Sequence, residues 1–346
     1  MEESLSKKLS FYNFLCTVFI VIYHSRYVIK YFTASTLPAV DKLVVSCDLV
    51  GLIAMGSFFT ISGFLFYLGL HDKASLIKKL KKRVFSLLIP FVAWNTLMLI
   101  QNVCVGWYSH NLNITLNDIV LGYTFYTFNG GFWYLLALIF LLVLSPAILP
   151  LKNKPKLFLV IVALSFIGAF YVGEYVTATT LVGKWFTRLV YYIPLYLLGA
   201  YFGLCKDALV AKRNIAVSII SALLSVAIIV LYMLEILTPA VNWILLHILP
   251  ISLWLTLDCA LFAKIKITYP MKATFFVYAM HMYLIDLLVK QIANFIPYHS
   301  LRLYLSVLLF VAFVAAIYLI AVLVSYCAKR ILPEKIYSAL SGGRVK

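Results

Sequence analysis

The residue best suited to chemistry in this sequence is His24, which stands near the end of an apolar stretch of about nineteen residues, 11–29. Such a stretch is long enough to cross a bilayer core of ~30 Å as a helix. An ionisable side chain inside a spanning helix is costly and rarely faces lipid, so His24 indicates a functional site, where a neutral imidazole can accept a proton. A histidine that reaches the interface or bonds to a neighbouring helix explains the same residue, and the stretch alone leaves both readings open.

A basic segment at residues 71–83, HDKASLIKKLKKR, is the second feature that could bind a charged ligand. It carries six Lys and Arg residues, and the last two, Lys82 and Arg83, directly precede the next apolar run. Residues of this kind attract phospholipid head groups, and they equally suit the phosphates of an anionic cofactor in the cytosol. The sequence allows either partner.

Ser62 is a polar residue within an apolar stretch. Around it, Gly56, Thr60 and Gly63 form a stripe of small residues that lets another helix approach closely. By spacing alone this is a packing helix, in which Ser62 can donate a hydrogen bond.

Trp133 and Arg188 stand near the expected outer ends of two apolar runs. Trp133 is typical of the aromatic belt at a membrane interface, and Arg188 either extends to the interface or assists an oxyanion or a substrate carboxylate. The loop before Trp133, residues 106–131, contains no Lys or Arg and is rich in Asn, Thr and Tyr. It suits a saccharide cleft and equally a plain outer loop.

The elements that must position these residues are membrane helices. The chain of 346 residues is 64% hydrophobic and 12% charged, whereas soluble domains are about half apolar and a quarter charged. We expect an all-α integral membrane bundle of about ten transmembrane helices over residues 1–327, and a short cytoplasmic tail, 328–346. The spans are predicted near residues 11–29, 49–70, 84–105, 132–150, 157–172, 187–204, 214–236, 242–262, 273–295 and 303–327.

The distribution of Lys and Arg predicts the topology. Of the 29 such residues, 22 fall on the side of the two termini and seven on the other side, alternating loop by loop. This is the positive-inside pattern, which places both termini in the cytoplasm. The formal net charge of +17 is therefore explained by the topology in the lipid bilayer and does not indicate nucleic-acid binding.

The six cysteines include no CxxC pair and no spacing typical of metal ligands, so no metal is expected. Cys47 and Cys104 both fall near predicted outer ends of spans, so a disulfide is conceivable. Buried free thiols are the simpler expectation.

Taken in order along the chain, several short motifs resemble those of the membrane-bound acyltransferase family 3, whose members acylate sugars of surface polysaccharides and glycolipids. Ten spans is also the architecture of that family. The residues that carry the resemblance are His24, Phe58-Phe59-Thr60-Ile61-Ser62-Gly63-Phe64-Leu65, Lys82-Arg83, Ile89-Pro90-Phe91, Phe132-Trp133-Tyr134-Leu135, Pro146, Phe275, Tyr278 and His281.

The resemblance implies an enzyme of the bacterial plasma membrane that transfers acyl groups other than amino-acyl groups. The acyl donor would be cytosolic acyl-CoA, with acetyl-CoA as the first expectation, and the acceptor a hydroxyl of a saccharide or glycolipid at the outer face. His24 would be the general base, and Lys82 and Arg83 would hold the coenzyme A phosphates. The residues expected near the substrates are Trp133, Arg188 and Ser62.

One position departs from the family pattern. The family usually has a basic residue eleven positions before the histidine, where this chain has Asn13, and Lys8 is the nearest substitute. This departure widens the range of acyl donors to succinyl and other groups. His281 and Tyr278 look like an interhelical hydrogen bond, and no carboxylate is assigned to orient His24 among Asp41, Asp48, Glu174 and Asp286.

The main rival is a transporter or flippase that exports a lipid-linked or nascent saccharide. Ten spans and intramembrane histidines serve such a protein equally well. The pairing of an outer-half histidine with a basic cytoplasmic mouth favours the enzyme, whereas an internal repeat and helices broken at mid-membrane would favour the transporter.

Overall fold

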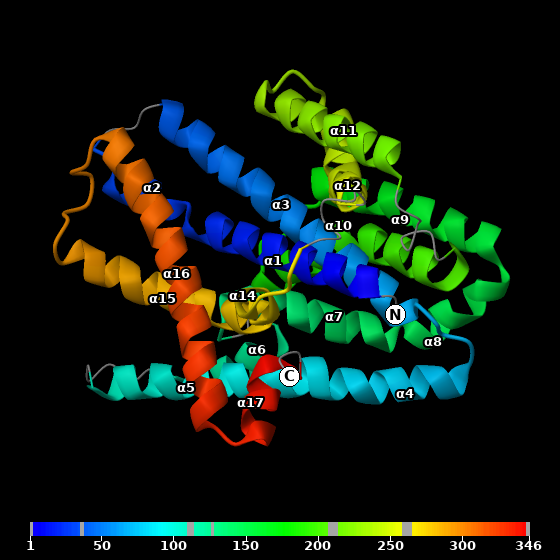
Figure 1. Ribbon diagram of the computed structural model, residues 1–346, viewed down its shortest axis with the longest axis horizontal. Coiled ribbons are helices and arrows are strands. Elements are labelled where there is room, and N and C mark those ends of the chain that lie inside the picture. Colours follow the sequence, from blue (N-terminus) through cyan, green and yellow to red (C-terminus); the bar gives the residue numbers. More distant parts are fainter. Residues whose placement is uncertain are drawn as a thin grey trace. The chain divides into compact units, whose positions relative to one another are not determined.

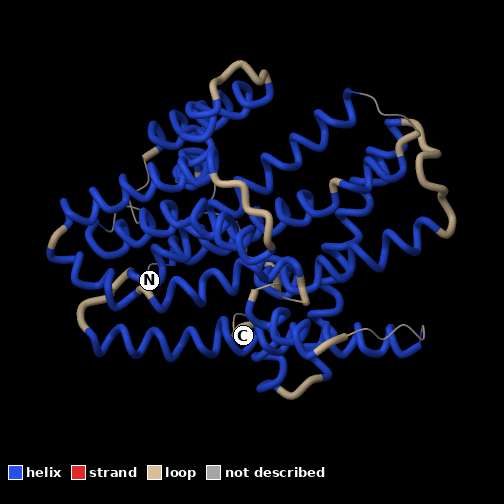
Figure 2. Tube along the Cα trace, turned by 180° about the vertical axis from the view of Figure 1, so that it is seen from behind, coloured by secondary structure: helices blue, strands red, loops and turns tan. Residues whose placement is uncertain are grey.

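The computed structural model describes residues 3–34, 38–108, 114–125, 128–206, 214–257 and 265–343. These residues form helices joined by short loops, and no strand occurs among them (Figure 2). Within this part of the chain, nine helices are long and apolar enough to cross a membrane, or ten if one bent pair is counted as a single span. The prediction of an all-α membrane bundle of about ten helices is confirmed; the side on which the termini lie stays a prediction.

The chain forms two compact units. The first consists of Met1–Thr60 and Val210–Cys327, and the second of Ile61–Leu209 and Ala328–Lys346. The boundary between them falls inside helix α3 (Pro38–Tyr67), whose first part belongs to one unit and whose last two turns belong to the other.

Helix α1, which carries His24, packs along α15 and against α14 in the first unit, and α11 packs against α12 (Figure 1). Side chains on the outward faces of α11 and α16, such as Leu223 and Leu319, stay about two-thirds exposed, as expected of helices that face lipid. The helices of this unit are α1 (Glu3–Ser25), α2 (Tyr27–Phe32), the first part of α3, α11 (Ile215–Met233), α12 (Pro239–Thr256), α14 (Tyr269–Lys272), α15 (Thr274–Ala293) and most of α16 (Leu303–Ile331).

In the second unit, α3 and α10 approach each other backbone to backbone. A Cβ atom on Gly63 would overlap the carbonyl oxygen of Tyr196, and one on Gly203 would overlap that of Phe64. Gly63 of the small-residue stripe therefore lies where α3 contacts α10. The unit contains α4 (Lys73–Arg83), the π-helix Val84–Leu88, α5 (Ile89–Tyr108), α6 (Leu116–Thr124), α7 (Trp133–Val143), α8 (Ser145–Ile148), α9 (Pro155–Tyr175), α10 (Leu181–Tyr201), the π-helix Phe202–Lys206 and α17 (Glu334–Ser341).

The spans predicted at 11–29, 49–70 and 84–105 leave residues 30–48 and 71–83 as an outer and an inner loop, and this expectation is wrong for most of their length. In place of the outer loop 30–48, α2 runs to Phe32 and α3 already begins at Pro38. In place of the inner loop 71–83, Asp72 caps the helix α4, because its side chain accepts from the Ser75 backbone N–H at 2.8 Å. Both segments are too polar for a bilayer core, yet proline at a first turn and an N-cap aspartate both favour a helix.

The third span begins with a π-helix at the entrance to its apolar part. The backbone N–H of Ile89 donates to the Val84 carbonyl, five residues back. Pro90 explains the wider turn, because it has no N–H to donate and its ring would clash with the carbonyl of Ser86 in a regular α-helix. The turn lies directly after Lys82 and Arg83, so it affects where these two side chains point.

The predicted fourth span, residues 132–150, is bent. The helical stretches Gly130–Val143 and Ser145–Asn153 meet at an angle of 52°. Pro146 stands in the first turn of the second stretch, where it is tolerated but cannot continue a hydrogen-bond ladder from the first. At the other end of the chain, the tail contains the helix α17, and the Trp94 indole N–H of α5 donates to its Leu340 carbonyl at 2.9 Å.

Candidate active site

His24 lies half-buried in the last turn of α1, one residue before the helix ends. Arg26 holds this end in place: its Nε lies 2.7 Å from an oxygen of Asp48 on α3, and its Nη1 donates to the Tyr23 carbonyl at 2.6 Å. The guanidinium also lies over the rings of Tyr23 and Tyr27, at 4.0 and 4.3 Å. Helix α3 therefore fixes the backbone on which His24 stands.

The Tyr23 ring packs edge-on against the imidazole of His24, with ring centroids 4.7 Å apart. Gly51 of α3 makes room for it, because a Cβ atom there would overlap the Tyr23 ring. The position of the His24 ring thus depends on a glycine 27 residues further along the chain.

His281 of α15 lies beside His24, with ring centroids 5.1 Å apart and ring planes inclined at 47°. The side chain of His281 is fully buried. Its Nδ1 lies 2.5 Å from the Tyr278 carbonyl oxygen of its own helix, whereas its Nε2 has no hydrogen-bond partner in the described part of the chain. The observed bond therefore lies within α15, and the His281 ring does not form the expected hydrogen bond to another helix of the described residues.

An unsatisfied buried acceptor costs about 1–3 kcal/mol, so such an atom in a native site calls for an explanation. The sequence places His281 among the residues of the family resemblance and predicts a structural hydrogen bond for it. Its neighbour His24 lies 257 positions earlier, and only the packing of α15 along α1 brings the two rings together.

In the second unit, Ser62 and Arg83 share a small pocket. The Ser62 hydroxyl bonds to the Tyr134 hydroxyl at 2.7 Å, and the Arg83 guanidinium lies 5.9 Å from the Phe66 ring. No carboxylate of the described residues forms an ion pair with Arg83. A guanidinium among hydroxyl groups, without an acidic partner, can bind an anionic group. The pocket is lined by Ser62, Phe66, Arg83, Leu87, Leu138, Leu142 and Tyr196.

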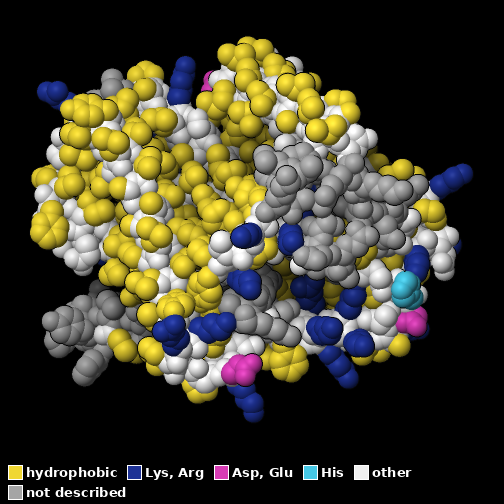
Figure 3. All heavy atoms as spheres, viewed as in Figure 1, with side chains coloured by type: hydrophobic (Ala, Val, Ile, Leu, Met, Phe, Trp, Pro, Cys, Tyr) yellow, Lys and Arg dark blue, Asp and Glu magenta, His cyan; other side chains and the backbone are white. Residues whose placement is uncertain are grey.

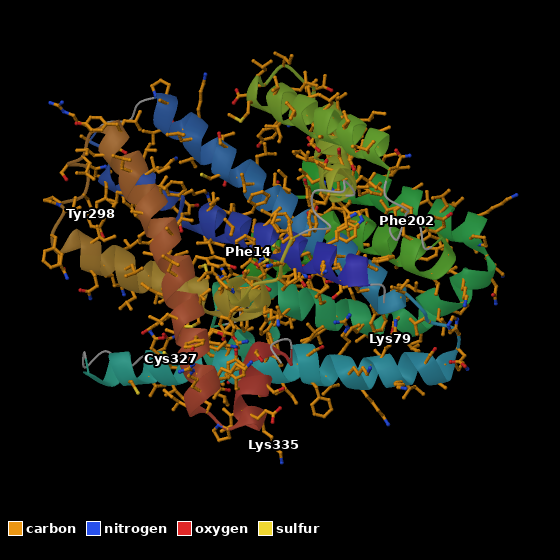
Figure 4. The ribbon with its side chains drawn as sticks, in the orientation of Figure 1. Phe14, Lys79, Phe202, Tyr298, Cys327 and Lys335 are labelled. Carbon is orange, nitrogen blue, oxygen red and sulfur yellow. The ribbon has the colours of Figure 1, made fainter. Side chains whose placement is uncertain are left out.

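Lys82 faces a different, more open pocket of about 620 Å³. Consecutive helical residues point about 100° apart, so the two neighbours lie on different sides of the segment that leads into the π-helix. Lys and Arg side chains gather over α4 and α17 in Figure 3, and Lys335 is labelled on α17 in Figure 4. This pocket is lined by Lys82, Phe85, Ser86, Ile89, Glu334, Lys335, Ser338, Ala339, Gly342 and Gly343.

Part of the basic segment has a structural task. Lys79, labelled in Figure 4, donates from Nζ to the Phe66 carbonyl at 2.7 Å and also to that of Leu68. Lys152 donates to the Leu70 carbonyl at 3.1 Å. The last carbonyl groups of a helix have no partner within it, and these two ammonium groups satisfy them at the end of α3.

Trp133 and Arg188, predicted separately as substrate contacts, lie together. The exposed guanidinium of Arg188 on α10 is 5.8 Å from the Trp133 ring at the start of α7, and Tyr192 packs against the same ring at 5.9 Å. An aromatic face beside a cation is an arrangement that can contact a polar, ring-shaped ligand.

Lys8, the proposed substitute for the basic residue missing at position 13, packs within the first unit. Its Nζ lies 3.9 Å from the Trp254 ring on α12, and only 9% of the residue is exposed. Tyr12, one turn further on, bonds to the Ser57 hydroxyl at 2.8 Å. Sixteen residues separate Lys8 from His24, which corresponds to about 24 Å along the helix.

Two of the four carboxylates considered for His24 have basic partners, since Asp48 pairs with Arg26 and Asp41 with Lys30 at 3.2 Å. No cluster of residues that could hold a metal ion occurs within the described ranges. Cys47 and Cys104 are free thiols; Cys47 is buried and Cys104 exposed.

The family model described as "Acyltransferase domain" (Acyl_transf_3) matches residues 14–327 of the chain. This range contains His24, Lys82, Arg83 and His281. The chain therefore belongs to acyltransferase family 3, and it is a multi-pass membrane acyltransferase. Neither a curated protein nor a solved structure matches it.

Proposed function

We propose that the protein moves an acyl group, in the first instance acetyl, from cytosolic acyl-CoA to a hydroxyl of a surface saccharide or glycolipid. The family match over residues 14–327 is the observation that carries this proposal. The distribution of Lys and Arg supports termini in the cytoplasm, and the location proposed from the family resemblance is the bacterial plasma membrane.

His24 acts as the general base. Its neutral imidazole takes the proton of the acceptor hydroxyl, the hydroxyl oxygen forms a bond to the thioester carbonyl carbon, and the carbon–sulfur bond breaks. The proton then passes from His24 to the departing coenzyme A thiolate. From Phe11 to His24 is thirteen residues, which places the ring ~20 Å along the span, in its outer half.

Arg83 and Lys82 bind the phosphates of the donor: Lys82 lines the pocket of about 620 Å³, and Arg83 lines one of about 20 Å³, which has to widen to admit a phosphate. Arg83 is the stronger candidate because its guanidinium has no acidic partner among the described residues and lies close to the hydroxyl groups of Ser62 and Tyr134. Lys82 is exposed, so water screens its charge more strongly.

Trp133 and Arg188 contact the acceptor. An indole ring stacks on the apolar face of a sugar, and the adjacent guanidinium can donate to its hydroxyl groups.

A saccharide exporter is the second candidate, and the bend of the fourth span is the observation that favours it. The bend begins after Val143, about 20 Å along the helix from Gly130, so it lies beyond the midplane of a ~30 Å core. Pro146 accounts for it without a transport function.

Turnover by the purified full-length protein in detergent tests the proposal. Acetyl-CoA and an acceptor glycan are supplied, and release of the coenzyme A thiol is measured. His24→Ala should reduce turnover by about 10²–10⁴-fold, the usual contribution of a general base, and leave binding of acetyl-CoA unchanged. His247→Ala is the matched control, because the His247 ring is buried against Trp243 on α12 and its Nδ1 lies 2.8 Å from the Trp243 carbonyl. A protein that neither binds nor turns over acyl-CoA would be an exporter by this measure.

A further inference from the structure

The His281 ring has a defined hydrogen-bonding state. A carbonyl oxygen only accepts, so the 2.5 Å contact between His281 Nδ1 and the Tyr278 carbonyl requires the hydrogen on Nδ1. In a neutral ring, Nε2 then carries a lone pair and is an acceptor. This acceptor is buried and has no partner within the described ranges.

The two neighbouring imidazoles differ in burial. The bond to its own helix and complete burial fix the ring of His281, and α15 packs along α1. His24 is half-buried at a helix end, where a substrate can reach it. At a centroid separation of 5.1 Å, two ring nitrogen atoms that face each other lie at the usual hydrogen-bond distance of ~3 Å.

The carboxylates that could orient His24 from α3 are engaged elsewhere. Asp48 and Asp41 pair with Arg26 and Lys30. A neutral acceptor has a further advantage in this place, because a buried carboxylate inside a membrane would need its own compensating charge.

We propose that His281 is a positioning residue for His24: its Nε2 accepts a hydrogen bond from the His24 ring and holds the tautomer whose other nitrogen takes the hydroxyl proton. When His24 becomes an imidazolium, the same bond is retained, and no proton moves to His281. The inference deepens the proposed function and rests on it.

Two substitutions separate positioning from mere packing. His281→Phe keeps an aromatic ring but removes the acceptor, whereas the amide oxygen of His281→Gln reaches the place of Nε2. We expect His281→Phe to lower kcat by about 10–100-fold, the usual effect of losing an orienting partner, with KM for acetyl-CoA unchanged. We expect His281→Gln to recover most of kcat, and the control His247→Phe to turn over like the wild type.

The tautomer of His24 can also be measured by NMR, which tests the inference without any turnover. In protein labelled with ¹⁵N-histidine, the His24 resonances are identified by their loss in His24→Ala. They should report one tautomer in the wild type and in His281→Gln, and a mixture in His281→Phe. If the His24 resonances are the same in His281→Phe as in the wild type, the inference is wrong. It is equally wrong if His281→Phe and His281→Gln lose kcat to the same extent. An inactive wild type with the expected tautomer shift would contradict only the proposed function.

Discussion

The contact between α3 and α10 gives the most direct structural prediction. Gly63→Ala adds one methyl group, which would overlap the carbonyl oxygen of Tyr196 on α10. The backbone nitrogen of Ala200, also on α10, would lie 3.0 Å from the added carbon atom. Backbone atoms cannot rotate aside as a flexible side chain can, so the two helices must separate. Overpacking of this kind costs about 1–3 kcal/mol, and at about 2 °C per kcal/mol for a large chain the melting temperature should fall by about 2–6 °C.

The assay is thermal unfolding of the purified protein in detergent, followed by the loss of the monodisperse peak after heating. Gly168→Ala on α9 is the matched control, because a Cβ atom there would meet nothing within 4 Å. Alanine is the better helix former by about 1 kcal/mol, so this control should melt at the wild-type temperature or above it. Equal melting temperatures for Gly63→Ala and Gly168→Ala would refute the close approach of α3 and α10.

Three further predictions concern single side chains of the second unit. Tyr134→Phe leaves the Ser62 hydroxyl without its 2.7 Å partner and should destabilise the protein by about 1 kcal/mol, measured as a lower melting temperature; no change would show that the bond is unimportant. The Ser75 backbone N–H and hydroxyl hold the pKa of Asp72 below its usual 3.8, so its cap stabilises α4 above pH 3.8 and the contribution is lost as the pH falls through the lower folded pKa. Asp72→Asn should therefore melt below the wild type at pH 7 and approach it at pH 3, and a difference independent of pH would contradict this. Arg83→Gln should raise KM for acetyl-CoA at least about tenfold, with partial recovery in Arg83→Lys, and an unchanged KM would remove Arg83 from the donor site.

Much of the architecture could be predicted from the sequence because the bilayer imposes it. Every backbone polar group inside the membrane must be satisfied locally, so each long apolar run has to be a helix. The errors arose where hydropathy is a poor guide to helicity. Residues 38–48 and 73–83 are helical although they are too polar for a bilayer core, since capping and the first-turn residues decide helix formation there.

The candidate site also has a part that the sequence predicts and a part that it does not. His24 could be identified as a candidate from one stretch, because the cost of an ionisable group in lipid is a property of the residue and its neighbours in sequence. Lys82 and Arg83 were expected to act as a pair, but the turn of the helix places them in separate pockets.

The sequence by itself thus determined the membrane class, a bundle of about ten spans and the histidine at the end of the first span, all of which depend on local composition. Only the tertiary structure decided that His281 lies 5.1 Å from His24 and that Ser62 and Arg83 share a pocket. Such contacts depend on which helices pack together and on which faces meet, and side-chain contacts between distant helices leave no pattern in the spacing of residues along the chain.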